Sequence, residues 1–444
     1  METQGKISYL TVLKQTNIRR LLISSVINRF GDCVDAIAFT WLVYQITGSA
    51  TWTAVIFAMN QLPGVVLLPF AGAWVESRNK KKIIVYTDFI RGLIIAGFVC
   101  LFFLGKANPY LMILFTVLIT TVESINQPAE SAFVRELVCR EYYPTVQSLR
   151  MVAGQMATIM STASAGVIIA KLGVNVAMLI DVATFYICGF IILFIQYQQR
   201  EFDDESINEQ SYMTKLAEGL KYIKRKKMVI YLCVVAVAYN FFLSPYNCLL
   251  TPHIIDFYKR DADFQSFCLS WNWTAAIVGS LIVAKVAKKY RFKIVNAISG
   301  EFIGAALVLF AIGGSVGVGR LSPFVFALTS MVLIGTFGSI TSGVLNIEFA
   351  TNVEQDYVAR VSSVFNAFAC ASMPIGSGIV SLFTLKFNSL QIIEFSGIAC
   401  GMFFGGLLVL AYIEKNKEKN YATSITREYQ IMQKENGVNS GAVG

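Results

Sequence analysis

Long apolar segments alternate with short polar connectors along almost the whole chain. Twelve of these segments have roughly 20 or more residues, which is the length that an α-helix needs to cross a bilayer. The pattern therefore predicts an all-α membrane protein with 12 transmembrane helices. We expect these helices near residues 21–46, 52–74, 83–104, 110–131, 145–170, 174–197, 228–252, 264–285, 294–315, 322–347, 358–384 and 391–413.

The connectors divide into a basic set and a set that is nearly free of cations. Of the 37 Lys and Arg residues, 28 fall on the side that holds both termini, six fall on the other side and three lie within helices. Cytoplasmic loops of membrane proteins carry the excess of Lys and Arg. The sequence therefore predicts a multi-pass protein of the cell membrane with both termini in the cytoplasm.

The composition excludes several classes of protein. The 444 residues are 55% hydrophobic and 15% charged, which is more apolar surface than a soluble domain can bury. The net charge of +9 comes from cations at the ends of apolar segments, so nucleic acid is not an expected partner. The nine Cys residues are scattered, no CxxC pair occurs and the chain has a single His. We therefore expect no metal and no cofactor.

A long polar connector between the sixth and seventh helices divides the chain into two halves. Within it, residues 212–227 place apolar side chains on one face, which predicts an amphipathic helix on the inner leaflet. Residues 75–83 resemble residues 286–294 at an offset of 211, as expected for two parallel, pseudo-symmetric repeats with the substrate between them. We expect an N-terminal six-helix bundle over 1–197, a cytoplasmic linker over 198–227, a C-terminal six-helix bundle over 228–413 and a disordered cytoplasmic tail over 414–444.

The connector after the second helix resembles a loop signature of the major facilitator superfamily, G-x-x-x-D-R-x-G-R/K-R/K. Its positions are occupied by Gly72, Glu76, Arg78, Lys80 and Lys81. The chain departs from the signature at Glu76, Ser77 and Asn79, where the family has Asp, Arg and Gly. The resemblance implies the major facilitator fold, with an acidic residue that caps a neighbouring helix and cations that hold an inward gate. On the next helix, Asp88 and Arg91 are expected to pair at the Glu76 loop.

Further segments resemble the branch of the superfamily that contains macrolide-efflux (Mef-type) and siderophore exporters. The resemblance covers nearly the whole chain and implies efflux of amphipathic drugs or antibiotics, with macrolides first, by a proton-coupled antiporter that works through alternating access. Export of a siderophore or another self-made metabolite is an alternative, and a non-transporting membrane sensor or assembly partner is an alternative of another class. The segments are Gly31-Asp32, residues 41–44, Thr47 to Ser49, Leu62-Pro63, Asp88 to Arg91, Ala359 to Ser362 and Met373 to Gly376.

The first helix carries an unusual group of polar residues. Asn28, Arg29, Asp32 and Asp35 fall within an arc of about 120° and form one polar face. Asp32 lies close to the middle of the bilayer core, where a charge costs several kcal/mol or more unless it is paired or hydrated. We expect Asp32 to bind a proton or sense a cation, with Arg29 one turn below it and Asp35 facing the cavity. An Arg29–Asp32 ion pair that only holds helices together is the structural alternative.

A second candidate for coupling is Glu123, in the inner half of the fourth helix. A carboxyl group without a partner at that depth favours its protonated form, which suits proton exchange near neutral pH. A hydrogen-bonded structural Glu is the alternative. Asp181, Glu301, Glu348 and Glu394 are nearer to helix ends, so we expect them to be hydrated at the membrane interface.

Aromatic and soft side chains around helix breakers are the candidates for substrate contact. A proline inside a membrane helix frees a carbonyl group and permits a bend. Ordinary helix packing is the alternative for each of them. No phosphate-binding G-x-x-x-x-G-K-[ST] motif and no catalytic constellation is present, so we expect a monomeric carrier of a small amphipathic substrate and protons in the lipid bilayer, and not an enzyme. The candidates are Tyr239, Asn240, Phe242 and Tyr246 in the seventh helix and Asn366 and Met373 in the eleventh.

Overall fold

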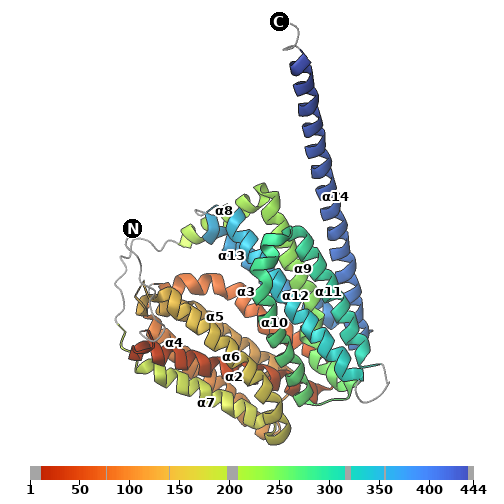
Figure 1. Ribbon diagram of the computed structural model, residues 1–444. Helices are drawn as coiled ribbons and strands as arrows, with labels where there is room; N and C mark the ends of the chain where they lie inside the picture. The colour runs from red at the N-terminus through yellow and green to blue at the C-terminus, as the bar shows by residue number, and fades with distance from the viewer. Residues whose placement is uncertain are drawn as a thin grey trace.

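The structure is a computed structural model that describes residues 12–76, 78–139, 141–197, 209–315, 322–354 and 357–438. Long helices dominate these ranges (Figure 1). The first half holds α2 (Thr16–Thr47), α3 (Ala50–Glu76), α4 (Lys80–Phe103), α5 (Pro109–Leu137), α6 (Tyr143–Leu172) and α7 (Val174–Leu193). The linker holds α8 (Glu209–Arg225). The second half holds α9 (Lys227–His253), which continues as the π-helix η2 (Ile254–Tyr258), then α10 (Ala262–Lys289), α11 (Phe292–Gly313), α12 (Ser322–Asn352), α13 (Val358–Phe383) and α14 (Ser389–Val438).

Eleven helices in the described ranges are long and apolar enough to cross a membrane. The twelfth, α2, has 32 residues but is diluted by the polar face that contains Asp32 and Asp35. It packs against α6 and α7, so that face is directed toward other helices of the first half. The predicted all-α membrane fold with 12 helices is confirmed when α2 is counted.

Short polar residues and glycine set several helix ends. The Asn79 side chain accepts a hydrogen bond from the Lys82 N–H at 3.0 Å and thereby caps the start of α4. Asn108 caps α5 in the same way, and Pro109 follows it at the first position of the helix. Gly48 adopts the left-handed conformation with a φ of 58° and closes α2.

The helices of each half pack mainly against one another. In the first half α2 contacts α6 and α7, and α4 contacts α5 and α7. In the second half α11 contacts α12 and α14, α10 contacts α12, and α9 contacts α13. The halves meet where α6 packs on α10 and α3 packs on α13. We propose that the chain is organised as the two bundles, linker and tail expected from the sequence, with boundaries at residues 197, 227 and 413.

The last helix is longer than the sequence pattern predicts. A helix was expected to end near residue 413 and to be followed by a disordered tail, but α14 is a single helix of 50 residues that reaches Val438. Its C-terminal part extends far beyond the other helices (Figure 1). Residues 414–436 contain no Pro or Gly and many good helix formers. Extending an existing helix avoids the cost of nucleation, which explains why these polar residues continue it.

Candidate functional site

The polar face of α2 meets α4, α5 and α7 at the centre of the first half. Asp32 accepts hydrogen bonds from Arg91 Nη2 at 3.1 Å and from Asn28 Nδ2 at 3.2 Å. The same Arg91 nitrogen lies 3.9 Å from Glu123 Oε2 on α5. The guanidinium group also lies over the Phe185 ring of α7, 4.1 Å from its centroid. One buried Arg therefore connects two of the predicted coupling residues and joins four helices.

A glycine allows α7 to approach α2 at the same level. A Cβ atom at Gly31 would lie 2.1 Å from Thr184 Oγ1 and 2.6 Å from Asp181 Oδ1, so no larger residue fits without a shift. Asp181 is 1% exposed, accepts a hydrogen bond from Thr184 and interacts electrostatically with Asp35 and Arg91. The expectation that Asp181 is hydrated near a helix end is wrong, because close packing at Gly31 places it inside the bundle.

Two carboxyl groups, Asp32 and Glu123, thus lie beside the Arg91 guanidinium group, and Asp35 and Asp181 interact with it electrostatically. We call Asp32, Asp35, Glu123 and Asp181 the carboxyl cluster. Asp35 is half-buried and its Oδ1 atom has no hydrogen-bond partner. Several carboxylates at such close quarters repel one another, and one cation cannot neutralise all four in a medium of low dielectric constant. The arrangement can therefore bind and release protons.

The structure does not show the Arg29–Asp32 ion pair that was the structural alternative, nor the expected Asp88–Arg91 pair. Arg29 does not pair with Asp32, because its Nε atom donates to Thr158 Oγ1 of α6 at 2.9 Å. Arg91 occupies the place beside Asp32, and it is not paired with Asp88. Asp88 is 4% exposed and instead accepts a hydrogen bond from Asn126 Nδ2 at 2.9 Å. A spacing of three residues places Asp88 and Arg91 on one helix face, but the longer Arg side chain reaches across to α2.

The basic residues at the start of α4, just after the loop that follows α3, contact other helices of the first half. Lys80 is 1% exposed, and its Nζ atom lies 3.1 Å from Glu136 Oε1 on α5. Tyr197 donates a further hydrogen bond to Glu136, and burial and this bond raise the pKa of Tyr197. Lys81 Nζ donates to the Leu193 carbonyl oxygen at 2.8 Å, where a cation is favourable at the C-terminus of α7. These cations tie α4 to α5 and α7; their predicted role in an inward gate stays a prediction.

Two further residues of the loop signature, Arg78 and Gly72, show no contact with another helix in the described residues. The Arg78 guanidinium group lies 4.1 Å from the centroid of the Trp74 ring and donates to the Trp74 carbonyl oxygen. A Cβ atom at Gly72 would meet no atom within 4 Å. The backbone of Glu76 ends α3, but its side chain lies outside the described residues, so its expected capping role stays a prediction.

Two of the predicted substrate contacts lie in the interior of the second half. Tyr239 is 7% exposed; its hydroxyl donates to the Asn296 carbonyl oxygen at 2.9 Å and accepts from Thr341 at 2.8 Å. Tyr246 is 4% exposed and its hydroxyl contacts Met331 Sδ at 3.1 Å. Neither ring can touch a substrate in this conformation, so helix packing, the structural alternative, accounts for both.

The other predicted contacts separate into two groups. The Phe242 ring packs against Phe403 of α14, with centroids 5.8 Å apart, and is therefore also a packing residue. Asn240 Nδ2 donates to the carbonyl oxygen of Ala369 on α13 at 3.1 Å. Met373 lies on the same helix and is half-buried, and Asn366 is exposed there. The Met373 carbonyl oxygen accepts a hydrogen bond from Ser244 of α9 at 3.2 Å, so Asn240 and Met373 lie at the contact between α9 and α13.

Contacts between the halves gather at the end of the bundle away from the N-terminus. Tyr44 on α2 donates its hydroxyl to both carboxylate oxygens of Asp256 in η2, at 2.7 Å. Thr384 after α13 donates to Thr51 on α3 at 3.0 Å. At the opposite end, two buried hydrophobic clusters of the described chain are each built from one half alone. The halves are therefore held together at one end in this conformation.

Sequence reasoning did not select several neutral residues that hold charged side chains in and near the carboxyl cluster. Asn126 holds Asp88, Thr158 holds Arg29 and Thr184 holds Asp181. A signal existed on α5, where Glu123, Asn126 and Glu130 are spaced by three and four residues and so share one helix face. Thr158 and Thr184 carry no such signal, because single Thr residues are common in membrane helices.

Comparison with known proteins agrees with this architecture. Residues 7–444 match the family model described as transmembrane secretion effector. The multidrug efflux pump Tap of Mycobacterium tuberculosis is 21% identical over 369 residues, which cover 80% of this chain and 84% of Tap. Macrolide efflux protein A of Streptococcus pyogenes is 22% identical over 348 residues, which cover 78% of this chain and 84% of that protein.

A solved structure shares the fold. The bacterial homologue of the iron transporter ferroportin, crystallised in an inward-facing state, superimposes with a TM-score of 0.67 at 14% identity, covering 88% of this chain and 98% of that one. The resemblance to the Mef-type branch is confirmed by the sequence relatives. The chain therefore belongs to the transmembrane secretion effector family of the major facilitator superfamily, whose members are multi-pass membrane transporters of small substrates and not enzymes.

Proposed function

We propose that this transporter exports amphipathic drugs or antibiotics, macrolide-like compounds first, in exchange for protons. The observation that carries the proposal is the carboxyl cluster of the first half, in which Asp32 and Glu123 lie beside Arg91 and Asp35 and Asp181 interact with it electrostatically. Similarity to Tap and to macrolide efflux protein A supports drug-like cargo. A cluster rich in carboxyl groups also disfavours an anionic siderophore as cargo, because like charges repel.

Proton exchange would act through the Asp32–Arg91 pair. Asp32 as a carboxylate holds Arg91 at 3.1 Å and so ties α2 to α4. When Asp32 takes up a proton, its attraction to Arg91 falls, and the guanidinium group is left with Glu123 on α5. Protonation thereby changes which helices the buried Arg holds together, which links proton binding to helix movement.

The position of the contacts between the halves supports alternating access. With both termini in the cytoplasm, the contacts Tyr44–Asp256 and Thr51–Thr384 lie at the extracellular end. The transporter would then be closed to the outside and open to the cytoplasm, ready to take up cargo. Rocking of the two halves about a central site would break these contacts and open the other side.

Cargo would bind between the halves, next to α9 and α13 of the second half, which both contact α3 of the first half. Asn240, Asn366 and Met373 supply two amides and one soft thioether there. A mainly apolar surface with few fixed polar groups suits bulky amphiphiles better than sugars. We propose that a single chain performs the whole cycle as a monomer.

Efflux from intact cells tests this function. Cells that express the transporter are loaded with radiolabelled erythromycin, and its loss is followed with and without a protonophore. We expect rapid loss that the protonophore abolishes, and no loss from cells with Asp32→Asn. Glu141→Gln, which changes an exposed carboxylate near the inner end of α6, is the matched control and should export normally. Efflux that persists after collapse of the proton gradient would overturn antiport.

A further inference from the structure

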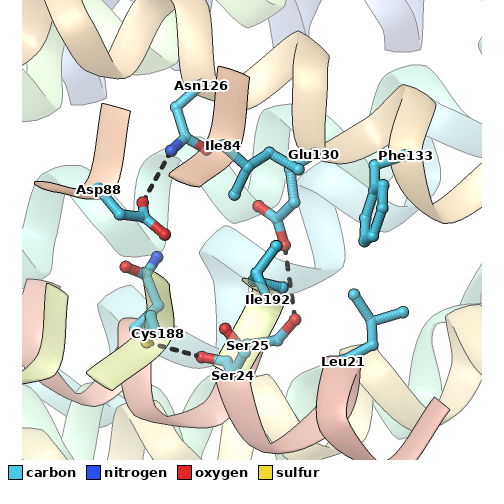
Figure 2. A pocket seen from close by; sticks show the side chains of 11 residues that line it. Leu21, Ser24, Ser25, Ile84, Asp88, Asn126, Glu130, Phe133, Cys188 and Ile192 are labelled. Carbon is cyan, nitrogen blue, oxygen red and sulfur yellow. Dashed lines mark hydrogen bonds between the residues drawn. The ribbon is translucent and has the colours of Figure 1, made fainter. Parts of the chain in front are cut away.

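A small internal pocket lies beside the carboxyl cluster, between α2, α4, α5 and α7 (Figure 2). Its volume of ≈ 20 Å³ is enough for one water molecule. Ser25 donates to Glu130 Oε1 at 3.4 Å on one side, and Asn126 donates to Asp88 on the other (Figure 2). The polar part of the lining consists of Ser24, Ser25, Asn28, Asp88, Asn126 and Glu130.

One hydrogen-bond acceptor in this lining has no partner within the protein. Asn28 Oδ1 is buried and has no hydrogen-bond partner, while Nδ2 of the same amide donates to Asp32 at 3.2 Å. Buried acceptors are nearly always satisfied, and water satisfies those that no protein group reaches. A water molecule in the pocket would donate a hydrogen bond to Asn28 Oδ1, and Asn28 would then hold this water next to Asp32, the carboxyl group that its Nδ2 atom contacts.

The Glu130 side of the pocket is more exposed than the Asp88 side. The Glu130 side chain is 34% exposed and pairs with Arg150 of α6, whereas Asp88 is 4% exposed. Glu130 lies seven residues beyond Glu123 on α5, which is two turns or about 10 Å toward the inner end of the helix. Of the two carboxyl groups that line the pocket, Glu130 is therefore the more exposed and the nearer to the inner end of the helix.

We propose that this pocket is a proton relay, with Glu130 as its cytoplasmic carboxyl group and water held by Asn28 as its middle step. The proposal rests on the proton exchange proposed above and adds the route. The Asp32 carboxylic acid gives its proton to the pocket water, which passes a proton to the Glu130 carboxylate. Glu130 then releases a proton to cytoplasmic water, and the Asp32 carboxylate left behind pairs with Arg91.

The charged groups around the relay fit these steps. Arg150 from α6 pairs with Glu130 and fixes the position of its carboxylate at the end of the pocket. The Asp88 carboxyl group of α4 interacts electrostatically with two charged groups, Glu130 on α5 and Arg91 on its own helix. Asn126 from α5 donates to Asp88 and keeps that side chain in place. This route lies inside the first half, so protons would not have to share the path of the cargo between the halves.

Time-resolved infrared spectroscopy tests the relay without using transport. The full-length transporter in nanodiscs is subjected to a rapid pH jump, and the C=O band of protonated carboxyl groups is followed. The part of the band that is lost in Asp32→Asn reports the cluster. We expect Glu130→Gln and Asn28→Leu to slow this part at least tenfold while its amplitude remains. Glu141→Gln, an exposed carboxylate at the same membrane end, should leave the rate unchanged.

The outcomes separate the route from the function. Wild-type rates in both Glu130→Gln and Asn28→Leu would overturn the relay and would mean that the cluster exchanges protons directly with the space between the halves. No Asp32-dependent band at all would overturn the relay and antiport together. A slowed band in both variants, combined with erythromycin efflux that ignores the protonophore, would support the relay and reject only the proposed use of the protons. Because Asn28→Leu keeps Glu130, loss of folding in one variant leaves the other as the test.

Discussion

The interiors of the two halves differ in charge although both are six-helix bundles. The first half buries Lys80, Asp88, Arg91 and Asp181. In the described part of the second half, the buried polar side chains are Ser, Thr, Asn, Gln and His253, with no Asp, Glu, Lys or Arg among them. Buried charges are expensive in a membrane and persist where they are paired or used. The contrast teaches that, in the described residues, buried charge is concentrated in the first half, where we propose that protons are exchanged.

The second half binds its helices together by neutral groups instead. The buried ring of His253 contacts Ser389 and the Phe310 carbonyl oxygen and packs on the Phe310 ring, with centroids 5.1 Å apart. Tyr239 bridges α11 and α12 through its hydroxyl group. These contacts join the helices of the second half without a buried Asp, Glu, Lys or Arg among the described residues.

Removing the central cation should have the largest effect. Arg91→Ala leaves the carboxyl cluster without the guanidinium group that touches Asp32 and Glu123, and breaking a buried pair costs roughly 3–5 kcal/mol. We expect loss of export and a much lower melting temperature in detergent. The double variant Arg91→Ala with Asp32→Asn should regain part of the stability. An unchanged melting temperature in the single variant would show that the buried Arg91 pair does not stabilise the first half.

Two of the Lys–Glu pairs sharpen the contrast. The Lys80–Glu136 pair of the first half is 1% and 9% exposed at its side chains, whereas the Lys226–Glu354 pair between the linker and the second half is 50% and 60% exposed. Lys80→Met should destabilise the protein by about 3 kcal/mol, because it leaves a buried carboxylate. Lys226→Met should cost between 0 and about 1 kcal/mol. Equal costs in chemical denaturation would show that burial does not separate these pairs.

The close approach of α7 to α2 predicts an effect of intermediate size. Gly31→Ala would place a Cβ atom 2.1 Å from Thr184 Oγ1 and push Asp181 away from the cluster. We expect a loss of roughly 1–3 kcal/mol of stability and slower export. Gly154→Ala is the control, since a Cβ atom at that helical position of the same half meets nothing within 4 Å. Similar melting temperatures for the two variants would argue against tight packing at Gly31.

The smallest effect concerns pH at the inner end of the first half. Burial and the hydrogen bond to Glu136 raise the pKa of Tyr197 above its ordinary value of 10.0. The folded protein therefore holds this proton more tightly than the unfolded chain, so the stabilisation is complete below pH 10 and is lost as the pH rises above it. The melting temperature of the wild type should fall slightly more between pH 9 and pH 11 than that of Tyr197→Phe. Parallel curves would contradict this.

The fold was largely predictable because apolar segments of membrane length leave few alternatives. The cost of a charge in the bilayer also selected Asp32, Asp35 and Glu123 from the sequence. Asp181 was missed because its burial depends on Gly31 of another helix, which no spacing along α7 reveals.

The pairing partners were less predictable than the candidates themselves. Arg29 is near Asp32 in the sequence, but Arg91 reaches it in space. Tyr239 and Tyr246 were predicted to contact substrate but are buried in this conformation, for a related reason. In a membrane helix both faces are apolar, so the pattern does not distinguish a ring in the packed interior from a ring that lines a cavity.

Proton movement in reconstituted liposomes tests the central claim that the first half couples protons to export. Purified transporter is placed in liposomes with a pH-sensitive dye inside, and erythromycin is added to the side of the cytoplasmic termini. The account predicts a dye signal that appears with the wild type, is absent with Asp32→Asn and is retained with Glu141→Gln. Erythromycin transport of equal rate in the wild type and Asp32→Asn, without any proton signal, would contradict it.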